Sequence, residues 1–322
     1  MRKLLWTLPL IPALALAQPL PEALKKAPEA PGVVIARLEQ ETKAKDLART
    51  LVDPLRTPLS ELQARQALAL AEARLRRALA QAESDIAAAY AQALEAALQV
   101  RLAEKALEVA ELALKAAEIR VRGGGATLLD LLDAQNRVLE ARKNLEAAKR
   151  GRDSAQASLE NLLGPWEPEP VAELPPLPEK GVVETLLKEN ADLSQLRHSL
   201  ELLRFQRGLL DESFAARKDI EALEDQARSL ETNLQNLERS LRVGLKARYD
   251  QLSPLLQGAK AAEEVYRAAK ERYAAEERRF KAGLASQLGL LQGELSLRQA
   301  ELALLQARHA YLKAYYGLLA SR

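Results

Sequence analysis

Residue types that commonly perform catalysis or bind metal ions are few in this chain and lie far apart. There is no cysteine, and the two histidines, His198 and His309, lack the spacing of a metal site. The glycines at 123–125 are not followed by the lysine and hydroxyl residue of a phosphate-binding loop. No serine stands in a recognisable hydrolase motif. We therefore expect no enzyme activity, no cofactor and no bound metal.

The glycines at 123–125 belong to a segment that occurs twice. Residues 120–132 read RVRGGGATLLDLL, and residues 279–291 read RFKAGLASQLGLL. Gly124 aligns with Gly283 and Thr127 with Ser286, at an offset of 159 residues. In each copy a long helical pattern enters a turn of small residues and a second helical pattern leaves it. The sequence thus predicts a tandem duplication of long antiparallel hairpins with their tips at these glycines.

Residues 60–122 follow an unbroken heptad repeat, and the return helix keeps it with Arg152 as the exception. Residues 60–122 contain no proline or glycine, and large apolar residues at one seam position face alanines at the other. Alanines let neighbouring helices approach closely. At 1.5 Å per residue this helix would be on the order of 90 Å long. Tyr266, Tyr273 and Tyr311 occupy seam positions of the second copy, where we expect them to fill the core with the hydroxyl reaching the surface.

Proline and glycine divide the chain into segments. Residues 164–178 read GPWEPEPVAELPPLP, which predicts a stiff extended connector. Pro54 and Pro58 set off a shorter helix at 32–52, whose counterpart is 182–206, and Pro254 and Gly258 are expected to interrupt and kink a later helix. The predicted organisation is a signal peptide at 1–17, an N-terminal segment with a short helix at 18–58, a first hairpin repeat at 59–163, a Pro-rich connector at 164–180 and a second repeat at 181–322.

The N-terminus predicts export. Arg2 and Lys3 precede an apolar run from Leu4 to Leu16, and residues 15–17 read ALA, which fits a small-residue cleavage site. The run of about 13 residues is shorter than the roughly 20 that span a bilayer. Charges are nearly balanced, with 47 basic and 45 acidic residues. Since they form no basic stripe with interleaved aromatics, nucleic acid is not an expected partner.

The signal peptide, the duplication, the alanine seams and the tip sequence RVRGGGATLLDLLDAQNRVLEA resemble the TolC family of outer-membrane efflux and secretion ducts. The resemblance implies a trimer in the periplasm and outer membrane whose long helices form a tapered tunnel. It also implies that the tips dock a periplasmic adaptor and an inner-membrane pump. Three glycines would supply turns that a side chain would obstruct, and the other residues would present a polar surface. The candidate docking residues are Arg122, Gly123, Gly124, Thr127, Lys281, Gly283 and Ser286.

Acidic residues just after a tip narrow the tunnel entrance in that family. The candidates here are Asp130 and Asp133, which are three residues apart and so share a helix face. Their equivalents in the second repeat are Gly289 and Gln292. Two acids near a helix N-terminus are equally explained by the helix dipole, so both interpretations stay open.

The predicted fold class is all-α, with long antiparallel coiled-coil hairpins forming a TolC-like α-barrel protomer. The family also has β-barrel strands, which need roughly 9 to 11 alternating residues each, but the sequence contains no recognisable pair of them. The closest approach is Arg242 to Tyr249. Contact with the outer membrane could therefore run through a partner.

Three functions follow from this reading of the sequence. The first is a TolC-like duct component for efflux or type I secretion. The second is a periplasmic coiled-coil adaptor or envelope spacer that conducts nothing, and the third is a peripheral binding module. A hollow ring or a trimer mass would favour the duct, whereas an adaptor would need additional non-helical domains.

Overall fold

The computed structural model describes residues 19–171, 173–210 and 216–322. The predicted signal peptide at 1–17 lies outside these residues. Every regular element in the described part of the chain is a helix. In chain order the helices are α1 (Leu20–Leu24), η1 (Ala27–Glu29), α2 (Pro31–Val52), α3 (Pro58–Arg122), α4 (Leu128–Leu163), α5 (Val182–Glu189), α6 (Ala191–Leu209), α7 (Arg217–Lys281) and α8 (Gln287–Leu319). None of them, over the residues described, is long and apolar enough to cross a membrane.

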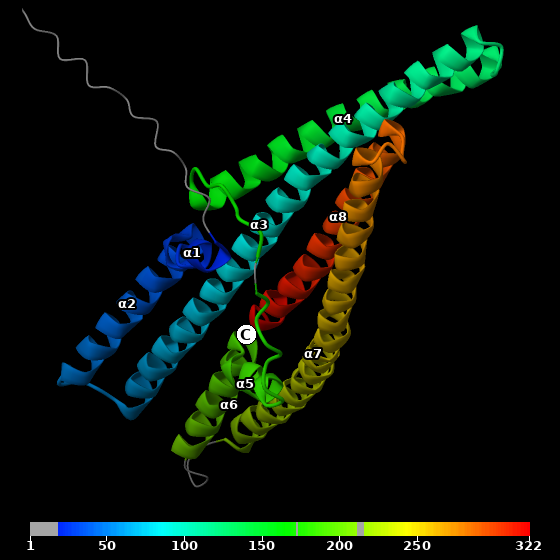
Figure 1. Cartoon of the computed structure of the whole chain (residues 1–322). Coiled ribbons are helices and arrows are strands. Elements are labelled where there is room, and N and C mark those ends of the chain that lie inside the picture. The colour runs from blue at the N-terminus through cyan, green and yellow to red at the C-terminus, as the bar shows by residue number, and fades with distance from the viewer. Residues whose placement is uncertain (1–18, 172, 211–215) are drawn as a thin grey trace, which may run out of the picture.

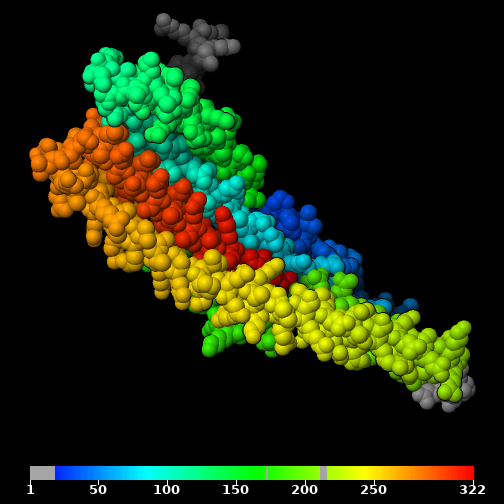
Figure 2. Space-filling model, turned by 90° about the vertical axis from the view of Figure 1, so that its right-hand side faces the viewer, coloured from blue at the N-terminus to red at the C-terminus, as the bar shows by residue number. Residues whose placement is uncertain are grey.

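Four long helices lie side by side in the order α4, α3, α8 and α7 (Figures 1 and 2). Helices α3 and α4 form the first antiparallel hairpin, and α7 and α8 form the second. The hairpins join through α3 and α8, which pack against each other. Both tips lie at the same end of the molecule. At the other end, α2 runs along the start of α3 and α6 along the start of α7.

Two clusters of buried side chains hold this layer together away from the tips. One surrounds Tyr90 of α3 and includes Leu159 of α4 and Leu312 of α8. The other surrounds Leu252 of α7 and includes Tyr311 of α8. Full burial of each such side chain contributes about 1.5–3 kcal/mol. The clusters therefore fix the hairpins at their bases, where α2, α5 and α6 add further cover.

The predicted seams are confirmed, and their burial decreases toward the tips. On α7, Leu245 and Leu252 are buried, Tyr266 and Tyr273 are half-buried, and Phe280 is exposed. The decrease follows from packing, because near the tip each helix has fewer neighbours. The first hairpin runs beyond the second tip as a two-helix projection (Figure 1).

Two expectations about helix boundaries are wrong. The segment 182–206 is not one helix, because the chain turns at Asn190 between α5 and α6. The buried Asn190 side chain accepts hydrogen bonds from the N–H groups of Asp192 and Leu193 at 3.1 and 3.0 Å, which caps α6. Helix α7 continues through Pro254 without interruption. Pro254 is exposed, so the carbonyl group that loses its intrahelical partner can be hydrated.

Candidate functional site

The first tip is a short, fully hydrogen-bonded turn between α3 and α4. Gly124 has φ +72°, a left-handed conformation that favours glycine. The N–H of Gly125 donates to the carbonyl of Arg120 at 2.8 Å, and the N–H of Gly124 donates to that of Val121 at 3.1 Å. These two bonds form a Schellman motif, which satisfies carbonyl groups at the end of α3.

The second tip has the same backbone hydrogen bonds as the first. Gly283 has φ +74°. The N–H of Leu284 donates to the carbonyl of Arg279 at 2.8 Å, and the N–H of Gly283 donates to that of Phe280 at 2.9 Å. Each of these positions is the first-tip position plus 159. The duplication read from the sequence is therefore preserved in backbone conformation.

The three glycines predicted to shape the tips differ in what the backbone requires of them. Gly124 and Gly283 need the positive φ that other residues rarely adopt. Gly123 has φ −84°, and a side-chain carbon built there would lie 3.5 Å from the carbonyl oxygen of Ile119, an ordinary contact. The expectation that a side chain would obstruct the turn therefore fails at Gly123, because its conformation suits any residue.

The hydroxyl residues after each turn cap the outgoing helix. Thr127 accepts from the N–H of Asp130 at 3.2 Å, and the Asp130 carboxylate accepts from the N–H and hydroxyl of Thr127, each at 2.8 Å. This is a reciprocal capping box. Ser286 accepts from the N–H of Gly289 at 3.1 Å. The second tip thus has the cap without the carboxylate.

The electrostatics of the first tip follow from this cap. Hydrogen bonds from the backbone and then the side chain of Thr127 lower the pKa of Asp130 below its usual value. Its carboxylate is therefore ionised, and it accepts its hydrogen bonds from within the tip. Asp133 lies one turn later on the exposed surface of α4. Asp130 thus stabilises the N-terminus of α4, as the helix-dipole interpretation expects. That Asp130 and Asp133 narrow the entrance of a tunnel stays a prediction.

The predicted basic residues also occur as a repeated pair. Arg122 lies 3.7 Å from Glu118, and Lys281 lies 2.8 Å from Glu277. Both pairs are exposed, so each contributes little to stability. They place charged side chains beside each turn.

Sequence reasoning missed a set of exposed apolar residues at the tips. Such patches on soluble surfaces commonly mark interaction sites. The two leucines that follow Thr127 could have indicated this set, since two adjacent leucines at the start of an amphipathic helix cannot both face the core. The set comprises Ile119, Leu128, Leu129 and Leu132 on the first tip and Phe280 and Leu284 on the second.

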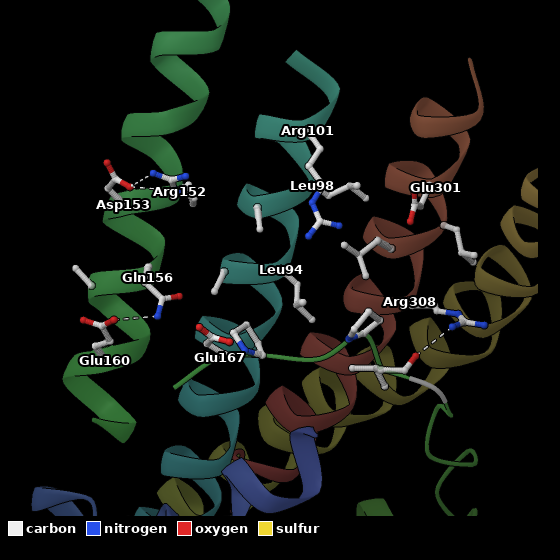
Figure 3. Close-up of a pocket in the computed structure, with 18 of the residues that line it drawn as sticks. Leu94, Leu98, Arg101, Arg152, Asp153, Gln156, Glu160, Glu167, Glu301 and Arg308 are labelled. Carbon is white, nitrogen blue, oxygen red and sulfur yellow. Dashed lines mark hydrogen bonds and ion pairs between the residues drawn. The ribbon is translucent and has the colours of Figure 1, made fainter. Parts of the chain in front are cut away.

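A cavity of about 770 Å³ opens at the base of the first hairpin. Figure 3 shows it between α3, α4, α8 and the connector that follows α4, with Leu94 and Leu98 of α3 in its lining. Arg308 donates to the carbonyl of Val171 in the connector at 3.1 Å and pairs with Glu263 at 3.3 Å. None of the predicted site residues lines this cavity.

Hydrogen bonds tie the connector to the helices it crosses. Tyr90 donates its hydroxyl to the carbonyl of Glu169 and accepts from the N–H of Glu169, both at 2.7 Å. Tyr311 donates to the carbonyl of Pro175 at 2.8 Å. Burial raises the pKa of both tyrosines to about 12. Over its described residues the connector contains no helix. Tyr311 is fully buried and its hydroxyl bonds to the connector, so the expectation that this hydroxyl reaches the surface is wrong.

A buried polar contact joins the two central helices. His309 of α8 is fully buried, and its Nδ1 lies 2.8 Å from a carboxylate oxygen of Glu95 on α3. Lys313 lies 3.4 Å from the same oxygen. Burial raises the pKa of Glu95, but the hydrogen bonds and charges of His309 and Lys313 bring it below its usual value. This cluster joins the two repeats through a buried contact between α3 and α8.

Two helices of the layer have open edges. Helix α4 packs mainly on α3, and α7 on α8 and α6. Apolar side chains are exposed along these outer helices, including Leu139 on α4 and Val265 on α7. The chain's own helices thus leave part of α4 and part of α7 uncovered, one at each edge of the layer.

Residues 59–165, which comprise the first hairpin, match the family model of outer membrane efflux proteins. This hairpin is therefore similar to the outer membrane efflux protein domain. The resemblance to the TolC family read from the sequence is thereby confirmed for this part of the chain. Among curated proteins, none matches the chain significantly.

Solved structures with the same fold cover nearly the whole chain. A membrane protein from Pseudomonas aeruginosa has a TM-score of 0.66 at 15% identity, covering 94% of this chain and 89% of its own. The CmeC outer membrane channel of Campylobacter jejuni has a TM-score of 0.65 at 11% identity, covering 94% and 85%. The outer membrane protein VceC of Vibrio cholerae has a TM-score of 0.63 at 16% identity, covering 94% and 95%. The expected all-α, TolC-like fold is confirmed.

Proposed function

We propose that this chain is one subunit of a TolC-like duct for efflux or type I secretion at the outer membrane. The observation that carries the proposal is the pair of tips with the same turn geometry, on a four-helix layer with two open edges. The match of the first hairpin to outer membrane efflux proteins supports the same function and location.

The open edges support a homo-oligomer, with a trimer as the expected state. Because α4 and α7 lie at opposite edges of the layer, α7 of one copy can pack beside α4 of the next. Repetition of this contact around an axis would close the layers into a tube. The exposed apolar residues of both outer helices, including Leu139 and Val265, would then be covered.

The tips support docking of a periplasmic adaptor and, through it, an inner-membrane pump. Each combines an exposed apolar residue, such as Leu128 or Leu284, with a basic residue beside the turn. Apolar anchors surrounded by polar residues are typical of protein interfaces. The glycine turns hold these groups in one geometry, so little ordering would be needed on binding.

The test replaces Gly124 and Gly283 together by valine. Both positions have positive φ, so the turns must change while the helices remain. We expect loss of transport complementation in cells with unchanged helix content by circular dichroism. Gly123→Val is the matched control, since its φ of −84° accepts a side chain. Unchanged complementation by the double variant would refute docking through the tips.

Native mass spectrometry and electron microscopy of the purified protein test the duct itself. A trimer with a hollow ring is expected. A protein that stays monomeric at high concentration would contradict the duct and leave the spacer function.

A further inference from the structure

The cavity at the base of the first hairpin lies where α4 and α8 pack on opposite sides of α3 (Figure 3). Helix α3 forms its floor, where Ala93 and Ala97 leave space that larger side chains would fill. The connector closes the end of the cavity that is farthest from the tips. The volume of about 770 Å³ is within the range of sites that bind small organic molecules.

The lining of the cavity is apolar along its floor. Leu94 and Leu98 of α3 are only 9% and 7% exposed. Leu304 and Leu305 of α8, both half-buried, also line the cavity, together with prolines of the connector. Burial of apolar surface is favourable by about 25 cal/mol per Å². The floor therefore favours a ligand with apolar groups.

Hydrogen bonds hold the connector wall in place. Gln156 of α4 donates to the carbonyl of Trp166 at 2.9 Å, and Arg308 of α8 donates to the carbonyl of Val171 at 3.1 Å. The connector is thus tied to both helices that flank the cavity. Because this wall is already ordered, a ligand would bind with little further ordering cost.

One arginine of the lining is free to bind a ligand. Figure 3 shows the Arg101 side chain extending from α3 past Leu98 toward the connector end of the cavity. No described residue forms a hydrogen bond or an ion pair with Arg101. A guanidinium can hold a carboxylate through two parallel hydrogen bonds. Arg101 therefore favours an anionic group on the ligand.

The other charged side chains of the lining are paired with neighbours, apart from two acids at the connector end. Glu160 accepts a hydrogen bond from Gln156 at 2.9 Å but has no basic partner among the described residues. Glu167 has no partner among them at all. The paired groups are Arg152 with Asp153 at 2.7 Å, Glu301 with Arg298 at 2.8 Å and Arg308 with Glu263 at 3.3 Å. The cavity thus has one free cation on α3 and two uncompensated carboxylates near the connector.

We propose that this cavity binds an apolar zwitterion, with its anionic group on Arg101 and its cationic group on Glu160 and Glu167. A short apolar peptide with free termini has this chemistry. The α3 part of the lining, from Ala93 to Arg101, spans about 12 Å at 1.5 Å per residue, and an extended tripeptide spans about 10 Å. The apolar side chains of the peptide would lie on the leucines of α3 and α8.

Neighbouring copies of the chain would not fill this cavity in the proposed duct. Their lateral contacts would be made at the outer edges of α4 and α7. The cavity instead lies over α3, between α4 and α8 (Figure 3). The site would therefore be open in a single chain and in the assembly.

Isothermal titration calorimetry of the full chain, purified after export, tests the proposal with trileucine. One peptide should bind per chain. Acetylation of the peptide's amine or amidation of its carboxylate removes one charge, and each should weaken binding roughly tenfold. Triglycine carries the same charges without the apolar side chains, so it should show no binding at the same concentrations.

Two protein variants assign the charges of the ligand to side chains. Arg101→Gln should weaken trileucine binding roughly tenfold but leave binding of the amidated peptide unchanged, because only the free carboxylate uses the guanidinium. Glu160→Gln with Glu167→Gln should likewise weaken binding of trileucine but not of the acetylated peptide. Arg76→Gln is the matched control, since Arg76 is an exposed arginine of α3 outside the cavity. Its peptide binding should equal that of the wild type.

The proposal is overturned if trileucine does not bind, if triglycine binds equally well, or if Arg101→Gln and Arg76→Gln have equal effects. Dependence on only one of the two peptide charges would also overturn it, because the ligand would then be a simple amphiphilic anion or cation. Peptide binding by one chain requires neither assembly nor transport. A failure here is therefore distinguishable from failure of the duct function.

Discussion

Replacement of Tyr90 by phenylalanine tests how the connector is held to the helical layer. The Tyr90 side chain is fully buried on α3, and its hydroxyl bonds both backbone polar groups of Glu169 at 2.7 Å. Tyr90→Phe keeps the ring and leaves those two groups without the hydroxyl. Loss of a buried hydrogen-bond partner costs about 1–3 kcal/mol. We expect a cost of about 1–2 kcal/mol, because Glu169 is only half-buried.

The pH dependence gives an independent reading of the same contact. Burial raises the pKa of Tyr90 to about 12, whereas the unfolded chain has a value near 10. A raised pKa stabilises the fold below pH 10, and this contribution is lost as pH rises from about 10 to 12. One such group steepens the fall of unfolding free energy by about 1.4 kcal/mol per pH unit.

The assay is urea unfolding at one fixed protein concentration from pH 8 to 12, a range that runs from below the pKa of the unfolded chain up to that of folded Tyr90. Tyr90→Phe should be less stable at pH 8 and should lose stability less steeply above pH 10 than the wild type. Tyr311, with the same raised pKa, continues to contribute in both proteins. Equal slopes would refute the assignment of this alkaline dependence to Tyr90. Equal stability at pH 8 would refute the energetic role of the connector bonds.

Three further predictions address the core, the central contact and the first tip. Leu252→Ala, at a fully buried position, should lower the unfolding free energy by about 2–5 kcal/mol, and a loss below 1 kcal/mol in urea titration would contradict the packing described. Glu95→Gln should lower the unfolding free energy by about 1–3 kcal/mol, because it weakens the contact with buried His309. Equal urea midpoints for the variant and the wild type would disprove this. Asp130 has a lowered pKa, so its stabilisation of the tip is present above the usual aspartate pKa and lost as pH falls through the lowered value. NMR titration should show the Thr127 amide shift in acid in the wild type and not in Asp130→Asn, and identical titrations would exclude the capping role.

The helices and tips were predictable because their determinants are local. The heptad register and the absence of proline from 60–122 identify α3, and the matched glycines identify both turns. The break at Asn190 was not predicted, since it depends on one side chain turning back to cap α6. The continuity of α7 through Pro254 was also missed. Pro254 is exposed, so water can bond the backbone carbonyl that loses its helical partner, and this exposure depends on the tertiary structure.

The spatial order of the helices could not be read from the pattern. The seams of α3 and α8 resemble those of α4 and α7, yet only tertiary packing places α3 and α8 in the middle. The candidate site was predicted at the level of the turns. Its apolar residues, such as Leu129 and Leu284, were missed because heptad reasoning assigns leucine to the core, whereas burial decreases where neighbouring helices end.

The identity of the two outer helices restricts how copies of this chain can associate. In the proposed duct, α4 of one copy would meet α7 of the next, so the contact would join unlike surfaces, and such heterologous contacts propagate in one rotational sense. A symmetric pair formed through two α4 helices would leave both α7 helices uncovered. The angle between successive copies therefore decides the outcome: a rotation that divides the full circle evenly gives a closed assembly, and any other rotation gives an open filament.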